Sequence, residues 1–193
     1  MSSTDLPTVA AIRQMAVPEL MALFSRLEAP ALTEMNGEFA AQLLKQPSLA
    51  ATVAGYAAVY NPFLLGVWLC KAFRPVSETQ GRGYNTFQLR GRTVQHFPMQ
   101  TLIAPSRYDG KPAYTLVYRA FQSRCGDIHM VDELRRVEAG VYLGIGTWGF
   151  TDNQRRTPLP FLLTGPGGPY RGDIGKPRRS FNLSKEVPGL RQG

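Results

Sequence analysis

Hydrophobic and polar positions along the chain follow different periods in three zones. In residues 1–60 the apolar positions recur at helical spacing, so that Leu20, Phe24 and Leu27 share one face of the run that follows Pro18. Proline is well tolerated in the first turn of a helix, where its missing N–H needs no partner. The pattern therefore predicts a helical N-terminal segment, with further helices over residues 38–44 and 48–60.

Residues 63–150 are typical of β-strands rather than helices. Short runs rich in β-branched and aromatic residues are separated by turn sequences such as Asp109-Gly110, a strong hairpin signal. Closely spaced strands without long helices between them favour an antiparallel meander over βαβ units. We predict an up-and-down antiparallel β-barrel or curled sheet, with an open α+β roll as the alternative. Its strands would cover residues 66–73, 84–89, 93–97, 100–104, 113–121, 128–137 and 141–150, with an eighth over 159–164.

Residues 165–193 are dominated by glycine, proline and basic residues, a composition that cannot bury enough apolar surface to offset the entropy of ordering. Eight of the 22 Lys and Arg residues, but only 3 of the 14 Asp and Glu residues, lie beyond residue 150. The sequence thus predicts one domain over residues 1–164 and a flexible basic tail over 165–193. Such a tail could be exposed to solvent and aid solubility, or it could contact a polyanion or a partner protein.

Gly66-Val67-Trp68 opens the first predicted strand of the barrel after a helical lead-in. This motif and the strand order resemble lipocalins and the wider calycin superfamily. The resemblance implies that Trp68 packs across one end of a barrel and that Gly66 allows the chain to pass close to it. The long N-terminal segment departs from the lipocalin pattern.

Aromatic residues at alternating strand positions indicate what the interior would hold. From residue 142 to 148 one strand face carries Tyr142, two glycines and Trp148, which leaves room beside large rings, in a cavity wall or in a filled core. We predict binding of a hydrophobic or aromatic small molecule inside the barrel. The ligand-binding candidates are Trp68, Tyr84, Tyr114, Tyr118, Arg119, Tyr142 and Trp148, and only those that face inward would contact the ligand.

Titratable and charged side chains are most concentrated in the run from residue 127 to 136. In a strand, His129, Glu133 and Arg135 would share one face and Asp132 the other, so either face would bring a carboxylate inward. A carboxylate in an apolar barrel can serve as a general acid or base. The alternative function is therefore a cofactor-independent cyclase or isomerase that acts on a hydrophobic substrate. A cross-strand ion pair on a solvated face is the simpler interpretation.

Other classes of function find little support in the sequence. Two Cys and two His residues have no metal-ligand spacing, so neither metal nor cofactor is expected. The letters G-x-G-x-x-G at residues 144–149 lack the following helix that a dinucleotide site requires. We expect a cytoplasmic protein without a transmembrane segment or a nucleic-acid partner, although the basic tail leaves that partner open. A homodimer is also compatible with the sequence.

Overall fold

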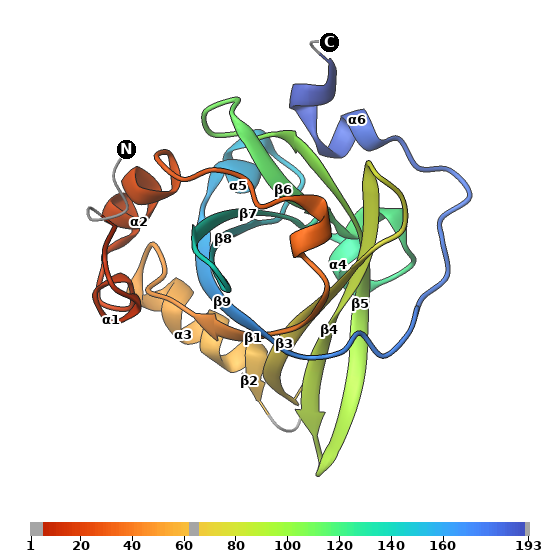
Figure 1. Cartoon of the computed structure of the whole chain (residues 1–193), viewed down its shortest axis with the longest axis horizontal. Helices are drawn as coiled ribbons and strands as arrows, with labels where there is room; N and C mark the ends of the chain where they lie inside the picture. The colour runs from red at the N-terminus through yellow and green to blue at the C-terminus, as the bar shows by residue number, and fades with distance from the viewer. Residues whose placement is uncertain (1–5, 62–65, 192–193) are drawn as a thin grey trace.

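Eight antiparallel strands form a closed barrel in the computed structural model, which describes residues 6–61 and 66–191. In Figure 1 the strands surround the line of view. They follow one another around the barrel in the order β1-β3-β4-β5-β6-β7-β8-β9, and β1 pairs with both β3 and β9 to close the ring. The prediction of an up-and-down barrel is confirmed, and the alternative of an open roll is excluded.

Strand β1, Gly37–Leu43, occupies the place where the sequence predicts a helix over residues 38–44, so that prediction is wrong. Its two alanines and its glutamine are compatible with a helix, and helix propensity is only a weak local preference. The two neighbouring strands supply backbone partners on both edges of β1, and this tertiary pairing decides its conformation. Without β1 the barrel would have two open edges.

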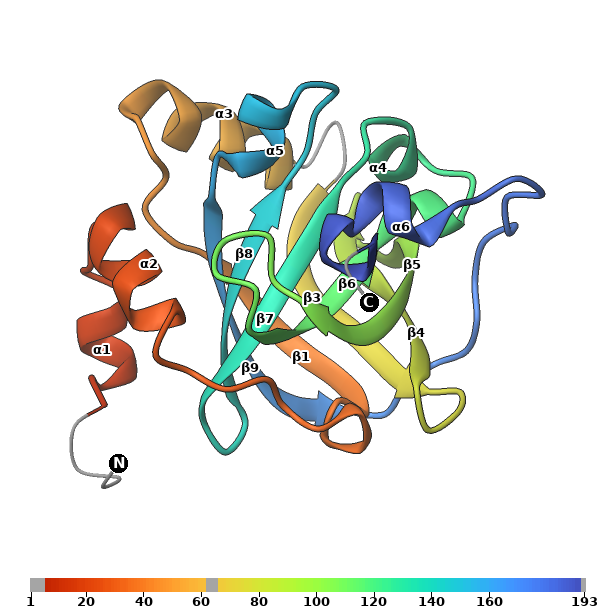
Figure 2. The same ribbon diagram turned by 90° about the horizontal axis from the view of Figure 1, so that it is seen from above.

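The remaining strands follow the predicted meander with shifted ends. The predicted strands over residues 93–97 and 100–104 form a single strand. The predicted strands at 113–121, 128–137 and 141–150 are each too long at the end of the barrel that lies at the top of Figure 2, which we call the upper end. There the chain turns into short helices and loops. The strands are β2 (Tyr60–Asn61), β3 (Gly66–Pro75), β4 (Gln80–Leu89), β5 (Arg92–Pro105), β6 (Pro112–Val117), β7 (Val131–Glu138), β8 (Val141–Thr147) and β9 (Leu159–Gly168).

The first two helices pack against the outside of the barrel rather than on its end. Helices α1 (Val9–Ile12) and α2 (Val17–Phe24) lie beside β8 and β9, as Figure 2 shows. Ile12, Leu20 and Phe24 are buried there in one cluster with outward-facing residues of β7, β8 and β9. Helix α3, Leu49–Val59, lies at one end of the barrel with α4 (Arg124–Asp127) and α5 (Asp152–Arg156).

The barrel interior is filled largely by aromatic and aliphatic side chains. The 3₁₀ turn η2, Leu32–Glu34, contributes Leu32 to this cluster and is followed by Met35, which is fully buried. The inward-facing aromatic residues are Phe39, Trp68, Phe73, Phe87, Tyr114, Tyr118, Tyr142 and Phe161. Burial of this many large side chains is the principal source of stability of the barrel.

The C-terminal segment follows the barrel wall. Strand β9 extends to Gly168, past residue 164 where the sequence predicts the domain to end. Beyond it, Asp173 pairs with Arg74 and Arg82 on the wall, and Val187 packs against outward-facing residues of β5 and β6. The segment ends in α6 (Leu183–Glu186) and η4 (Pro188–Arg191). Residues 1–5, 62–65 and 192–193 of the predicted segments lie outside the described residues.

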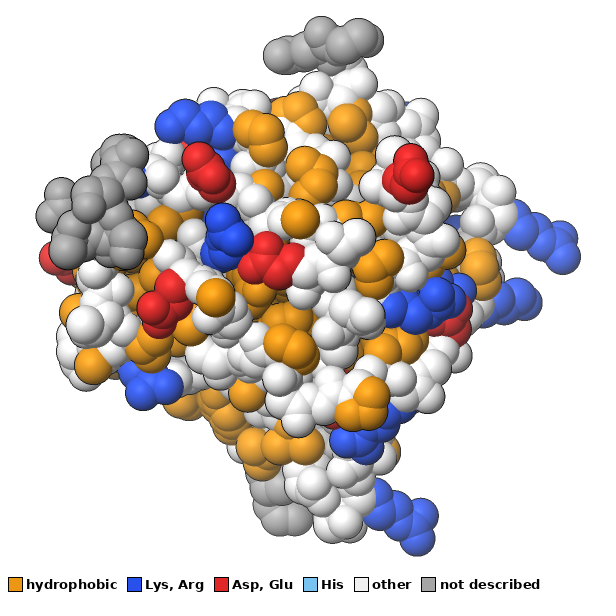
Figure 3. Space-filling view, in the orientation of Figure 1, with side chains coloured by type: hydrophobic (Ala, Val, Ile, Leu, Met, Phe, Trp, Pro, Cys, Tyr) orange, Lys and Arg blue, Asp and Glu red, His pale blue; other side chains and the backbone are white. Residues whose placement is uncertain are grey.

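Positive charge is not gathered on the barrel end that faces the viewer in Figures 1 and 3. There, acidic and basic side chains are both present and hydrophobic side chains lie between them (Figure 3). No helix among the described residues is long and apolar enough to cross a membrane.

Candidate functional site

Five side chains form a polar cluster inside the otherwise apolar barrel. They are Trp68 and Lys71 from β3, Asn85 from β4, Tyr118 at the end of β6 and Asp132 from β7. All five are buried, with exposed fractions of 7% or less. Buried charges cost free energy unless they are paired and hydrogen-bonded, so the partners of each charged group matter here. We call these residues the interior polar cluster.

Lys71 is the centre of the interior polar cluster. Its ammonium donates to Asp132 Oδ2 at 2.8 Å, to Asn85 Oδ1 at 3.0 Å and to the Tyr118 hydroxyl at 2.5 Å. Asn85 Oδ1 also accepts from the indole Nε1 of Trp68 at 3.1 Å, and the Tyr118 hydroxyl donates to Asp132 Oδ2 at 3.0 Å. Since an ammonium has three protons, all of its donors are engaged.

One polar atom of the cluster is left over. Asp132 Oδ1 is buried and has no hydrogen-bond partner among the described residues. It faces Gly146 of β8, where an added Cβ would lie 3.1 Å from this oxygen. An unsatisfied buried carboxylate oxygen is rare, because burial without a hydrogen bond costs free energy. Asp132 Oδ1 is therefore the atom that could accept a hydrogen bond from a further group.

Aromatic rings surround the charged pair. The Lys71 ammonium lies 5.2 Å from the centre of the Trp68 ring, 5.3 Å from that of Tyr118 and 5.1 Å from that of Phe161. These contacts add cation–π stabilisation to the hydrogen bonds. Burial raises the pKa of Tyr118 well above its ordinary value, and the neighbouring Asp132 carboxylate raises it further. Tyr118 therefore remains protonated and acts as a donor.

Cys125 lies close to the same charges, but its thiol stays protonated. Burial raises the pKa of its thiol to about 12, and the nearby Lys71 ammonium only partly opposes this effect. The thiol is the poor nucleophile of the two protonation states. Cys125 thus contributes an apolar surface to the upper end of the barrel.

A second group of buried charges lies on the outer face of β7. Glu133 accepts hydrogen bonds from Ser106 Oγ at 2.5 Å and from the backbone N–H of Arg107 at 2.9 Å. Burial raises the pKa of the Glu133 carboxyl, and these two hydrogen bonds oppose the increase. Arg135 is fully buried, and each of its two terminal nitrogens donates a hydrogen bond to an Asp109 carboxylate oxygen at 2.7 Å. This group joins the loop after β5 to the barrel wall.

The structure places the candidate site residues in separate regions of the barrel. Asp132 lies inside the barrel with four of the predicted ligand-binding aromatics, whereas Glu133 and Arg135 lie outside. Tyr84 is on the outer wall, where its hydroxyl accepts from the backbone N–H of Arg171. The interior members are Trp68, Tyr114, Tyr118, Tyr142 and Asp132.

The remaining three candidates lie around the barrel end. Trp148 follows β8 and is 42% exposed. His129 has a positive φ of 56° just before β7, and its Nδ1 lies 2.9 Å from Glu186 Oε1. Arg119 donates to the carbonyl of Gly126 at 3.2 Å. None of the three belongs to the interior polar cluster.

Lys71 and Asn85 are the cluster members that the sequence analysis misses. Strict alternation along β3 places Trp68 and Lys71 on opposite faces, because they are three positions apart along the strand. A β-bulge between Trp68 and Cys70 shifts the register, and both side chains point inward. A lysine within an apolar strand was the available signal, but only the bulge reveals its direction.

No group of three or more His, Cys, Asp or Glu side chains could hold a metal ion within residues 6–61 and 66–191. The interior polar cluster pairs one cation with one carboxylate and leaves a single free oxygen. At this oxygen the site can accept one further hydrogen bond.

Comparisons with known proteins support the fold alone. The chain matches no family model, and no curated protein matches it in sequence. Among solved structures, it is similar to a crystal structure of a protein from Thermomonospora curvata, with 15% sequence identity and a TM-score of 0.51. The match covers 81% of this chain and 91% of the other. At this identity the likeness identifies a shared β-barrel architecture.

The Asp109–Arg135 ion pair makes the free energy of unfolding depend on pH. The hydrogen bond from Arg135 holds the pKa of Asp109 below its ordinary value, so the ion pair contributes fully above the unfolded pKa of about 4. This contribution is lost as the pH falls through the lower, folded-state pKa. We expect the stability difference between the wild type and Asp109→Asn to shrink as the pH is lowered from 7 to about 3 in urea unfolding experiments. A constant difference over that range would contradict the role given to this pair.

Proposed function

We propose that the barrel binds an apolar small molecule that carries a hydroxyl or N–H group. The observation that carries this proposal is the buried Asp132 Oδ1, which lacks a hydrogen-bond donor while every other part of the interior polar cluster is satisfied. A ligand that donates to this oxygen would complete the cluster. The surrounding rings would contact the rest of the ligand.

The cluster favours a neutral ligand over an acid. All three protons of Lys71 are directed at acceptors within the barrel, so a ligand carboxylate would find no free donor on this cation. The charges of Lys71 and Asp132 already balance each other. A carboxylate added beside Asp132 would also meet like charge in a poorly solvated site.

Apolar side chains at the upper end of the barrel offer a route to the interior. Val94, Phe97, Cys125 and Met130 are only partly buried and pack against the interior cluster. The last two belong to or follow α4, a four-residue helix, and Val94 lies near the β4–β5 turn. Short elements with few partners open more easily than the barrel strands. Entry from this end would bring a ligand toward Asp132.

The two tryptophans of the chain give this proposal a direct test. Trp68 belongs to the interior polar cluster, whereas Trp148 is exposed, so their indole N–H signals in nuclear magnetic resonance report the interior and the surface separately. We expect phenol to shift the Trp68 signal and to bind about tenfold more tightly than anisole, which has the same ring but no donor. Benzoate would bind more weakly than phenol. Equal affinities, or a shift of Trp148 alone, would refute the proposal.

Gly146→Ala tests the location of this site without removing a charge. The added methyl group would lie 3.1 Å from Asp132 Oδ1 and would occupy the space where the ligand donor is expected. We predict that this variant loses about tenfold or more in affinity for phenol, as measured by titration of the Trp68 signal. Gly167→Ala is the matched control, because only one atom lies within 4 Å of an added Cβ, at 4.0 Å. Equal affinity of the two variants would place the ligand elsewhere.

Native mass spectrometry of protein purified from its producing cells would identify the ligand itself. A small molecule that is retained in the native protein and lost on denaturation would give the mass of the bound compound. We expect it to be apolar with at least one hydroxyl or N–H group. A retained fatty acid would contradict the preference for a neutral donor.

The second candidate function is an isomerase or cyclase with Asp132 as the base. It is favoured by one observation, namely that Asp132 is the acidic candidate located inside the barrel and has a free oxygen. The same oxygen that accepts a hydrogen bond could accept a proton from a bound substrate. Conversion of the co-purified compound by the wild type but not by Asp132→Asn, with binding retained in both, would favour catalysis over carriage.

A further inference from the structure

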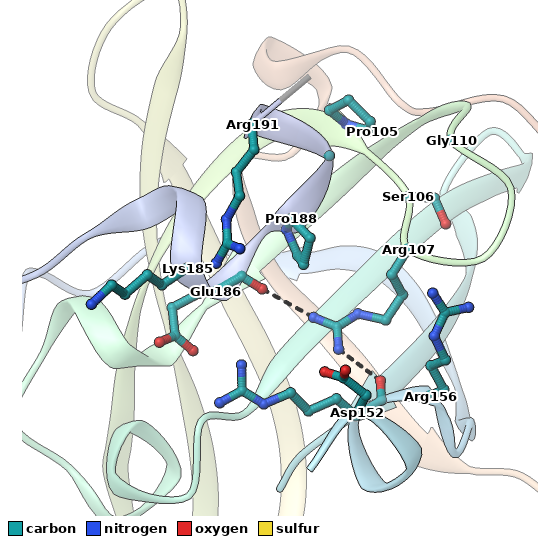
Figure 4. A pocket seen from close by; sticks show the side chains of 12 residues that line it. Pro105, Ser106, Arg107, Gly110, Asp152, Arg156, Lys185, Glu186, Pro188 and Arg191 are labelled. Carbon is teal, nitrogen blue, oxygen red and sulfur yellow. Dashed lines mark hydrogen bonds between the residues drawn. The ribbon is translucent and has the colours of Figure 1, made fainter. Parts of the chain in front are cut away.

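A separate cleft of about 760 Å³ lies on the outside of the barrel. It is formed by the loop that follows β5, by α5 and by the C-terminal α6 and η4, three segments that are far apart in sequence. Figure 4 shows Lys185 and Arg191 on the C-terminal side and Arg107 and Arg156 on the other. A cleft of this volume is large enough for a small-molecule ligand.

The lining of this cleft carries more positive than negative charge. Five of its twelve residues are basic and two are acidic. One of the two, Glu186, is already engaged with His129 at 2.9 Å. Arg155, Arg156 and Arg191 form no ion pair with any carboxylate in the described part of the chain. No described carboxylate therefore lies within 4.0 Å of these three guanidinium groups, although Asp152 lies in the same lining.

Arg107 forms the floor of the cleft, and only 9% of its side chain is exposed. Its two terminal nitrogens donate to the carbonyls of Arg155 and Glu186 at 2.7 and 3.1 Å, which ties α5 and α6 together. Its Nε is buried without a hydrogen-bond partner and lies 3.7 Å from Glu133 Oε1. Burial lowers the pKa of this guanidinium, because desolvation penalises its charge. A bound anion would offset that penalty.

We propose that this cleft binds a compact, multiply charged oxyanion of the oligophosphate class. Arginine is suited to such ligands because its planar donors match oxyanion geometry. None of the twelve lining residues is aromatic. Single-stranded nucleic acids usually require rings on which bases stack, and this feature favours a small anion over RNA. The site is independent of the barrel interior.

Sodium tripolyphosphate is the probe for this site, and isothermal titration calorimetry on the full chain is the measurement. We expect saturable binding at an ionic strength of about 0.01 M that weakens markedly at about 0.15 M. Arg156→Gln/Arg191→Gln should reduce the affinity about tenfold, because it removes two unpaired cations from the rim. Both side chains are exposed, so the fold is retained.

Arg90→Gln/Arg92→Gln is the charge-matched control. These arginines lie at the β4–β5 turn, on the side of the molecule opposite α6 in Figure 1. We expect the control variant to bind tripolyphosphate like the wild type. An equal loss in both variants would show that only net charge matters and would overturn the proposal. Absence of binding at low ionic strength would overturn it too, and so would tighter binding of oligouridylate than of tripolyphosphate.

Discussion

Lys71→Met is expected to destabilise the protein by about 3–5 kcal/mol. The substitution keeps the length and the apolar stem of the side chain but leaves the Asp132 carboxylate buried without its cation. Asp132 is 2% exposed and cannot regain solvent without opening the barrel. Urea unfolding followed by circular dichroism measures the loss as a change in the transition midpoint.

The double variant Lys71→Met/Asp132→Leu separates charge burial from lost packing. Replacing both members of a buried ion pair by apolar residues is often neutral or stabilising, so we expect it to recover at least about 2 kcal/mol of the loss. Lys176→Met is the control, since that lysine is exposed and should change stability by less than about 0.5 kcal/mol. A double variant less stable than Lys71→Met would show that the pair does not govern the energetics of the cluster.

Arg135→Met is expected to cost about 3 kcal/mol, for a different reason. Arg135 joins the outer wall to the N-terminal helices and to the loop after β5. Its guanidinium donates to Asp109 and to the backbone carbonyls of Phe24, Lys111 and Pro112, and it lies 4.5 Å from the Phe24 ring. Removing it leaves buried carbonyls without donors and loosens α2 from the barrel.

The adjacent Arg136 provides a control one position along the same strand. Its side chain is 46% exposed, and its ion pair with Glu34 is 3.5 Å long. Surface pairs of this kind contribute little, so Arg136→Met should cost less than about 1 kcal/mol in the same unfolding experiment. Similar losses for both arginines would contradict the importance given to the buried network of Arg135.

Faster hydrogen exchange should accompany the loss of Arg135. We expect the amides of α2 to exchange faster in Arg135→Met, whereas those of β8, held by two neighbouring strands, should be affected much less.

The two buried ionic groups of β7 explain why the sequence could not define a single site. Its alternating pattern correctly separates Asp132 from Glu133 and Arg135, and it states that one face must bring charge inward. Which face turns inward depends on the neighbouring strands, because both faces are covered in the folded protein. In the structure Asp132 lies inside the barrel with Lys71, whereas Glu133 lies outside and accepts a hydrogen bond from Ser106 in the loop after β5.

The amino-acid sequence by itself determined the antiparallel meander, since turn residues and two-residue alternation are local signals. It also predicted that aromatic residues on the strands would line the interior, but it did not determine which of them face inward. Trp68, Tyr114, Tyr118 and Tyr142 do, whereas Tyr84 lies on the outer wall. Only the tertiary structure decided that β1 is a strand, because its backbone partners come from distant β3 and β9. The bulge after Trp68 likewise decided that Lys71 points inward, because one extra residue reverses the facing of all that follow.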